Sequence, residues 1–364
     1  MILTLLLLSL GLVVLFSASY AAAGSKSNMK PTYFISRQAL FAGLGIIAML
    51  MASRIDYHRW QKFALPLMLI SLALLVIVLV PGIGVEHNKA RRWLNLYITE
   101  FQPSELAKFA MILCFAKLIN IMGPKRMKTI RYGILPFCAI LAVVVLLLIK
   151  QPHLSAAITI VLTGGVQMFL GGIGWGWMVA AMGGLVAVVF AALNGALAFL
   201  PHAQKRVDVW LDPFSDFRGS GWQASQSLIA IGSGGFWGLG LGQGRQKHLY
   251  LPEPYNDFIF AVACEELGFV GAVLIIVAFA ALIVRGYQIA GRAPDRFGML
   301  LVVGITTQMA LQTIINMSVV TGLMPVTGAA LPFFSYGGTS LLMLMGEVGI
   351  VLSVSRSIPA PKKG

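Results

Sequence analysis

The sequence carries little charge for its length. Only 11% of its 364 residues are charged, whereas 58% are hydrophobic. Soluble domains carry charge on about 25% of their residues. Apolar runs long enough to cross a bilayer recur along the whole chain. The composition therefore excludes a soluble fold and predicts an all-α polytopic membrane protein.

The sequence is also poor in cysteine and lacks the motifs of soluble enzymes. Cys114, Cys138 and Cys264 lie within apolar runs without metal-binding spacing, so they predict neither a disulfide nor a zinc site. There is no Walker loop, HExxH or GxSxG motif. The glycine-rich run 238–244 is a poor dinucleotide loop, because no strand precedes it and no suitable acidic residue follows. We expect no metal-ligand cluster and no nucleic-acid partner.

Apolar runs of about 20 residues, the length that a crossing requires, predict ten transmembrane helices. The stretch Ser17–Ala23 resembles a signal-peptidase site. No positive residue precedes Leu3, however, and the apolar run is longer than a signal core, so we expect an uncleaved first helix. The predicted spans are 2–22, 34–53, 63–80, 105–122, 134–150, 154–171, 176–199, 258–284, 299–323 and 338–355.

The distribution of Lys and Arg predicts the orientation. Positive charge is dense in the short loops after the second, fourth and eighth spans and in the C-terminal tail. Because such loops stay in the cytoplasm, both termini are expected there. The two large remaining segments, 81–104 and 200–257, then lie outside, the second between spans seven and eight. No flexible linker separates them from the spans, so 1–364 is predicted to be one domain.

The stretch 243–268 places a carboxylate at the start of the eighth span. Pro252 and Pro254 cannot lie inside a helix, so we expect the helix to begin at Asn256 or Asp257, both good N-caps. Asp257 would then be held at the level of the lipid headgroups. The alternative is that it only caps the helix.

Charged residues within the spans are costly, and each is a candidate for function. Glu105 and Lys108 are three residues apart at the start of the fourth span, so they can pair on one helix face. Such a pair could simply seal the helix end. We interpret it as structural support.

Three further carboxylates, Glu265, Glu266 and Glu347, lie deeper in the eighth and tenth spans. A carboxylate at that depth needs a cation, a hydrogen-bonded network or a proton. Lys108 and Lys117 are the available intramembrane cations. We favour a structural polar network that links spans four, eight and ten over a catalytic role.

Basic residues on the expected outer face suit an anionic group such as a pyrophosphate, which Arg binds through paired donors and Lys as a point charge. A lipid-linked headgroup would explain their position outside the membrane. A carboxylate beside it could serve as a general base for an attacking alcohol.

Several segments resemble the signature sequences of the SEDS family, the FtsW, RodA and SpoVE group. They occur in the family's order over nearly the whole chain: ARRW (90–93), FQPSELAK (101–108), GSGWQASQSLIAIGSGG (219–235), LYLPEPYNDFIFAVACEELG (249–268) and LPFFSYGGTSL (331–341). The run 238–258 and VVTGLMPVTG (319–328) are closer to the FtsW and SpoVE branch. Two departures are His153, where the family tends to carry an acidic residue, and the missing short tail before the first span, which suggests a start further upstream.

The resemblance implies a peptidoglycan glycosyltransferase that polymerises lipid II outside the cytoplasmic membrane, with undecaprenyl pyrophosphate as the leaving group. Asp257 matches the family's catalytic aspartate and would be the general base. The implied partners are a class B penicillin-binding protein and other membrane proteins of the division or elongation complex. A Mg²⁺ or Mn²⁺ ion could assist, although no cage for it is visible. The candidate substrate-binding residues are Arg91, Arg206, Arg245, Lys247 and Glu253.

Three alternatives stay open: a lipid II flippase, a RodA-type elongation polymerase and a structural scaffold. A flippase would also need a basic headgroup site, but transporters commonly show internal repeats and a site near the midplane. Two effects on the ionisation of Asp257 also oppose each other, and which is larger stays open. A helix N-terminus favours the ionised carboxylate and weakens the base, whereas desolvation acts in the opposite direction.

Overall fold

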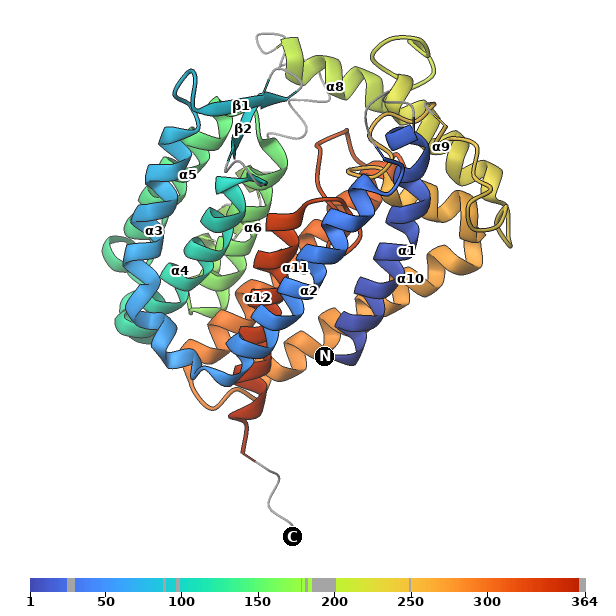
Figure 1. The fold of residues 1–364 in the computed structure, drawn as a ribbon. Coiled ribbons are helices and arrows are strands. Elements are labelled where there is room, and N and C mark those ends of the chain that lie inside the picture. Colours follow the sequence, from blue (N-terminus) through green and yellow to red (C-terminus); the bar gives the residue numbers. More distant parts are fainter. Residues whose placement is uncertain are drawn as a thin grey trace.

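A computed structural model of the chain describes residues 1–24, 30–87, 90–95, 99–177, 179–180, 183–184, 201–248 and 250–359. It is a bundle of helices with a small sheet at one end (Figure 1). The helices are α1 (Ile2–Gly24), α2 (Tyr33–Arg54), α3 (Trp60–Ile77), α4 (Pro103–Met127), α5 (Leu135–Lys150), α6 (Leu154–Leu170), α8 (Pro201–Leu211), α9 (Trp222–Gly234), α10 (Ile259–Gly291), α11 (Arg296–Val320) and α12 (Gly338–Arg356). Short helical turns, Tyr57–Arg59 and Ile130–Ile134, lead into α3 and α5.

The all-α polytopic prediction is confirmed. Within the described residues, 8 helices are long and apolar enough to cross a membrane, and α6 is a shorter apolar helix. These nine helices overlap nine of the ten predicted spans. The remaining prediction, 176–199, falls largely outside the described residues.

The segment 81–104 contains a sheet that the sequence did not predict. Strands β1 (Gly84–His87), β2 (Ala90–Asn95) and β3 (Glu100–Phe101) pair antiparallel in the order β1-β2-β3. Figure 1 shows β1 and β2 at the same end of the bundle as α8. Strands this short give too few alternations of apolar and polar residues to be recognised from periodicity.

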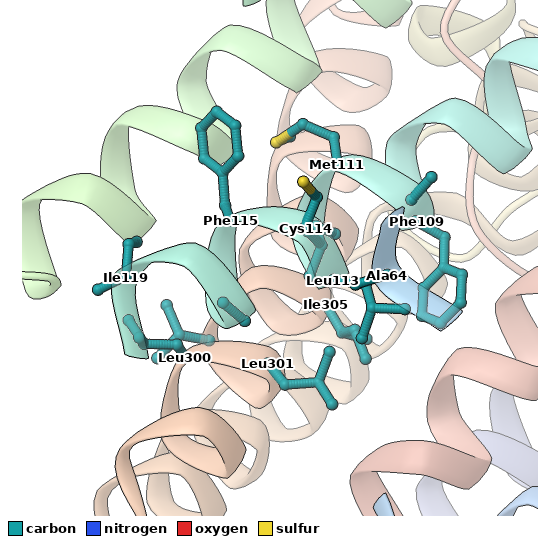
Figure 2. Close-up of a cluster of buried hydrophobic side chains, with 14 of the residues drawn as sticks. Ala64, Phe109, Met111, Leu113, Cys114, Phe115, Ile119, Leu300, Leu301 and Ile305 are labelled. Carbon is teal, nitrogen blue, oxygen red and sulfur yellow. The ribbon is translucent and has the colours of Figure 1, made fainter. Parts of the chain in front are cut away.

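The centre of the bundle is formed by α4 and α11, which are the most deeply buried of the long helices. Gln167 of α6 donates hydrogen bonds to the carbonyls of Ile112 (3.0 Å) and Leu300 (3.1 Å), and so joins these two helices. Gly304 permits this approach, since a Cβ there would lie 2.6 Å from the Gln167 amide nitrogen. Figure 2 shows the surrounding apolar cluster, which includes Ala64, Phe109, Met111, Leu113, Cys114, Phe115, Ile119, Leu300, Leu301 and Ile305.

Helix α10 is broken at Gly268, which has a positive φ of 66°. The glycine-rich segment after α9 fills the break: Leu239 N–H donates to the Glu265 carbonyl, and Phe269 N–H donates to the Gly235 carbonyl. A Cβ on Gly268 would lie 2.2 Å from the backbone nitrogen of Gly238. The run 238–244 is therefore rich in glycine because its backbone packs directly against the broken helix.

Candidate active site

A central cavity of about 1630 Å³ lies between the helices, and side chains from β2 and α8 also line it. The cavity therefore extends to the end of the bundle at which β2 and α8 lie (Figure 1). Helices α2, α4, α6, α11 and α12 also contribute side chains. The charged residues among its lining are Arg37, Arg92, Glu100, Glu105, Lys108, Arg206, Asp212, Glu253, Asp257 and Glu347.

Asp257 lines this cavity from the turn that precedes α10. Distant parts of the chain hold that turn in place. Asn316 Nδ2 of α11 donates to the carbonyls of Asp257 (2.7 Å) and Ala329 (2.6 Å). Ser335 Oγ donates to the Asn256 carbonyl at 2.7 Å. The segments 253–257 and 329–336 therefore form one hydrogen-bonded unit that fixes the backbone beneath the Asp257 carboxylate.

The predicted helix start was wrong by two to three residues. Helix α10 begins at Ile259 with Phe258 as its cap residue, and Asp257 does not cap it. Within the described part of the chain, no group donates a hydrogen bond to the Asp257 carboxylate. Burial, and to a smaller extent the nearby charge of Glu253, raise the pKa of Asp257 to about 6, and the charge of Arg92 opposes this shift. Desolvation therefore outweighs any effect of the helix end.

Arg92 is a charged cavity residue near Asp257 that the sequence did not single out. It lines the cavity, and its charge acts on both Asp257 and Arg206. Its Nε donates to the Gln151 carbonyl at 3.1 Å and its terminal nitrogen donates to the Pro152 carbonyl, so the guanidinium is fixed. Burial lowers the pKa of Arg92.

The neighbouring Arg91 was predicted instead, but it does not line the cavity and pairs with Glu86 at 3.1 Å. Successive side chains of a strand point to opposite faces. Recognising β2 as a strand would have shown that only one of the two arginines can face Asp257.

The other predicted residues divide into two groups. Arg206 and Glu253 line the central cavity together with Asp257. Arg245 and Lys247 do not line it, so the structure places them away from the predicted pyrophosphate site. Lys247 is buried, and its positive charge is neutralised by Glu266, which lies 2.7 Å from its Nζ.

The polar network also differs from the predicted one. Glu266 binds Lys247 and accepts a hydrogen bond from Ser17 Oγ of α1 at 2.6 Å. Glu265 accepts hydrogen bonds from backbone N–H groups, including that of Arg245 at 2.7 Å. Among the described residues, the polar partners of Glu265 and Glu266 therefore lie in the loop 244–247 and in α1, and not in the predicted spans four and ten. The Gly268 break brings this loop against α10, and no local pattern in the sequence shows that.

Glu105, Lys108 and Glu347 line the central cavity, whereas Lys117, the other predicted intramembrane cation, does not. Lys108 Nζ pairs with Glu105 at 2.8 Å, as predicted from their spacing. Glu347 is buried, and the Gln308 amide donates to its two oxygens at 3.0 and 3.3 Å. Lys108 and Glu105 lie near enough for their charges to act on Glu347.

His153 is buried in the wall of the cavity. Burial and the charges of Arg92 and Lys108 hold its pKa well below the ordinary value, so the imidazole is neutral. Within the described residues, no group of three or more His, Cys, Asp or Glu side chains could hold a metal ion.

Comparison with known proteins assigns the chain to a family. The family model described as "Cell cycle protein", for FtsW, RodA and SpoVE, matches residues 1–359. The chain belongs to this family. It is 43% identical over 358 residues to stage V sporulation protein E of Bacillus subtilis, covering 98% of this chain and 95% of the relative. It is 41% identical over 362 residues to a probable peptidoglycan glycosyltransferase FtsW of Trichlorobacter lovleyi, covering 98% and 93%.

Solved structures of this family have the same fold. A chain in a peptidoglycan synthase complex that coordinates polymerization and crosslinking superposes with a TM-score of 0.80 at 30% identity, covering 98% of this chain and 96% of that chain. The rod shape determining protein RodA of Thermus thermophilus superposes with a TM-score of 0.69 at 29% identity, covering 99% and 96%.

Proposed function

We propose that this chain is a peptidoglycan glycosyltransferase that polymerises lipid II at the outer face of the bacterial cytoplasmic membrane. The observation that carries the proposal is the half-buried Asp257, with a pKa of about 6, in a cavity that it shares with Arg92 and Arg206. An ionised carboxylate with a raised pKa suits a general base at neutral pH. The names and structures of the family members support the same reaction.

In the proposed reaction, Asp257 accepts the proton of the 4-hydroxyl of one disaccharide. The oxygen forms a bond to the anomeric carbon of a second disaccharide, and the bond from that carbon to the pyrophosphate breaks. Attack from the opposite face converts the α-linkage into a β-linkage. Undecaprenyl pyrophosphate leaves with the bonding electrons.

Arg92 and Arg206 are proposed to bind the pyrophosphate and to stabilise the charge that develops on it as it leaves. Arg92 takes the place of the predicted Arg91, because it is Arg92 whose charge acts on Asp257. A bound Mg²⁺ or Mn²⁺ would add Lewis-acid neutralisation of the pyrophosphate. Such an ion would take most of its oxygen ligands from the substrate and water, with Glu253 as the carboxylate that the chain can offer.

The predicted support residues are proposed to hold the site and not to react. Glu105 and Lys108 brace α4 at the cavity wall, and Glu265 and Glu266 anchor the loop that packs into the break of α10. The proposed orientation has both termini in the cytoplasm, as the loop charges predict. The proposed partner is a class B penicillin-binding protein, since a structural relative acts within a peptidoglycan synthase complex.

Polymerisation of purified lipid II by the purified chain, with and without the partner, tests this proposal. Glycan strands that require an intact Asp257 would support it. Transfer of lipid II across vesicle membranes without any polymer, even with the partner present, would instead favour the flippase alternative.

A further inference from the structure

A second pocket lies between the end of α10 and the end of α12 and has a volume of about 210 Å³. Figure 1 shows these helix ends on the side of the bundle that is opposite to β1, β2 and α8. We call it the inner pocket. The residues used below are Arg285, Gln288, Ile289, Arg292, Ser355 and Ile358, all of which line it.

The inner pocket presents two positive charges at the end of α10. Arg285 and Gln288 of α10 and Arg292, the cap residue that follows it, are spaced by three and four residues and all line the pocket, so they lie on the same side of this helix end. Both arginines are exposed, and Arg285 donates a hydrogen bond to Gln288 Oε1 at 3.1 Å. Among the side chains that the structure describes, no carboxylate forms an ion pair with either guanidinium.

The dipole of α10 does not explain why both arginines lie at this helix end. Helix C-termini attract cations, but the effect fades within the last turn. Arg292 directly follows α10, whereas Arg285 lies more than a turn earlier. The run 269–284 before Arg285 contains no charged residue, and Val284 at its end is 54% exposed. Arg285 therefore marks the level at which lipid hydrocarbon meets the headgroups.

We propose that the inner pocket binds the phosphate of an anionic phospholipid. The paired N–H groups of Arg285 and Arg292 suit a phosphate diester, and the Ser355 hydroxyl and Gln288 amide can donate to its remaining oxygens. Ile289 and Ile358 provide apolar contact for the glycerol. Basic pockets between membrane helices at this depth hold lipid headgroups in other proteins.

A phospholipid fits this position better than free phosphate, because the apolar surface of α10 continues from Arg285 into the membrane. Val277 and Leu274 are exposed on that continuation, at 57% and 63%. Val277 lies eight residues and Leu274 eleven residues before Arg285, which keeps them near the same face of the helix. Acyl chains can therefore lie along α10 while the phosphate remains at the arginines.

Lipid titration of the purified full chain tests the proposal. We would measure binding of dioleoyl phosphatidylglycerol and dioleoyl phosphatidylcholine in detergent by native mass spectrometry. Wild type should bind phosphatidylglycerol more tightly. The double variant R285Q/R292Q should bind it about 10- to 30-fold more weakly, as expected for the loss of two interfacial arginines.

The matched control is R126Q/R131Q, which also removes two exposed arginines from this end of the bundle. It should keep the wild-type affinity. Equal losses in both double variants would overturn the proposal, since only the overall charge would then matter. Equal affinity of wild type for the two lipids would also overturn it, and this arm does not depend on any variant folding.

Competition with inorganic phosphate distinguishes a site for a phospholipid headgroup from a site for free phosphate. At millimolar concentration it should not displace phosphatidylglycerol, and full displacement would identify a free-phosphate site instead. Every readout is lipid binding and none is polymerisation. The inner pocket can therefore fail while the proposed glycosyltransferase stands, and the reverse also holds.

Discussion

Two groups of buried charge lie near the N-terminal end of α10, and they are built in opposite ways. Beside the Gly268 break, Lys247 and Glu266 neutralise each other at 2.7 Å, and Ser17 Oγ donates to Glu266. In the central cavity, Asp257 has no hydrogen-bond donor among the described residues, and the nearby Arg92 is held by backbone carbonyls instead of by the carboxylate.

This difference indicates that the first group supports the structure and that the second is suited to catalysis. A buried ion pair holds a loop in place, because separating the two charges would leave each of them buried without a partner. A carboxylate that is desolvated but left without a partner is kept at a cost in stability, which is typical of a catalytic group. The segment 247–266 therefore contains both a structural ion pair and the candidate catalytic base.

The largest effect is expected from Asp257→Asn. Loss of a general base should lower the rate of lipid II polymerisation by about 10²- to 10⁴-fold. The melting temperature in detergent should be no lower than that of wild type, because the substitution removes a desolvated charge. Polymerisation at the wild-type rate would exclude the general-base role.

Lys247→Ala should have the opposite profile. It leaves Glu266 buried without its partner, so unfolding should become easier by about 3–5 kcal/mol, seen as a lower melting temperature. Arg245→Ala is the matched control, since Arg245 is exposed and binds Glu265 through its backbone N–H.

The double variant Lys247→Met/Glu266→Leu sharpens this test. Replacement of a whole buried pair by apolar residues is often neutral, so much of the lost stability should return. If Lys247→Ala abolished polymerisation without lowering the melting temperature, Lys247 would act on the substrate and the contrast with Asp257 would fail.

The two adjacent arginines of β2 should differ in their effect on polymerisation. Arg92→Ala should lower kcat/KM by about 10- to 100-fold, because a charged hydrogen bond to a phosphate contributes about 1.5–3 kcal/mol. Arg91→Ala removes the same charge from the outward face of the strand and should change the rate less than about threefold. Equal losses would mean that only the overall positive charge of this segment matters.

The smallest effect is a pH dependence of polymerisation. Because the pKa of Asp257 is raised to about 6, the base is ionised above that pH and is lost as the pH falls through it. The rate should therefore fall about tenfold per pH unit below 6 and level off above about 7. A profile that stays flat down to pH 5 would contradict an essential role for ionised Asp257.

Much of the fold was predictable because its information is local. Apolar runs identified nine of the described helices, and the three-residue spacing of Glu105 and Lys108 predicted their pairing. Pro252 and Pro254 placed the start of the eighth span to within a few residues. In each case the deciding interaction is with the bilayer or with a neighbour on the same helix.

The sequence by itself therefore determined the class of protein and nine of the spans, and it singled out Asp257 as the candidate base. Only the tertiary structure decided which charges Asp257 meets. Arg92 faces it because an unrecognised strand turns Arg91 away. Lys247 lies away from the cavity because a glycine break lets a loop reach Glu266, where Ser17, 249 residues earlier in the chain, also binds. These contacts depend on packing between segments that are distant in the sequence, so local periodicity cannot predict them.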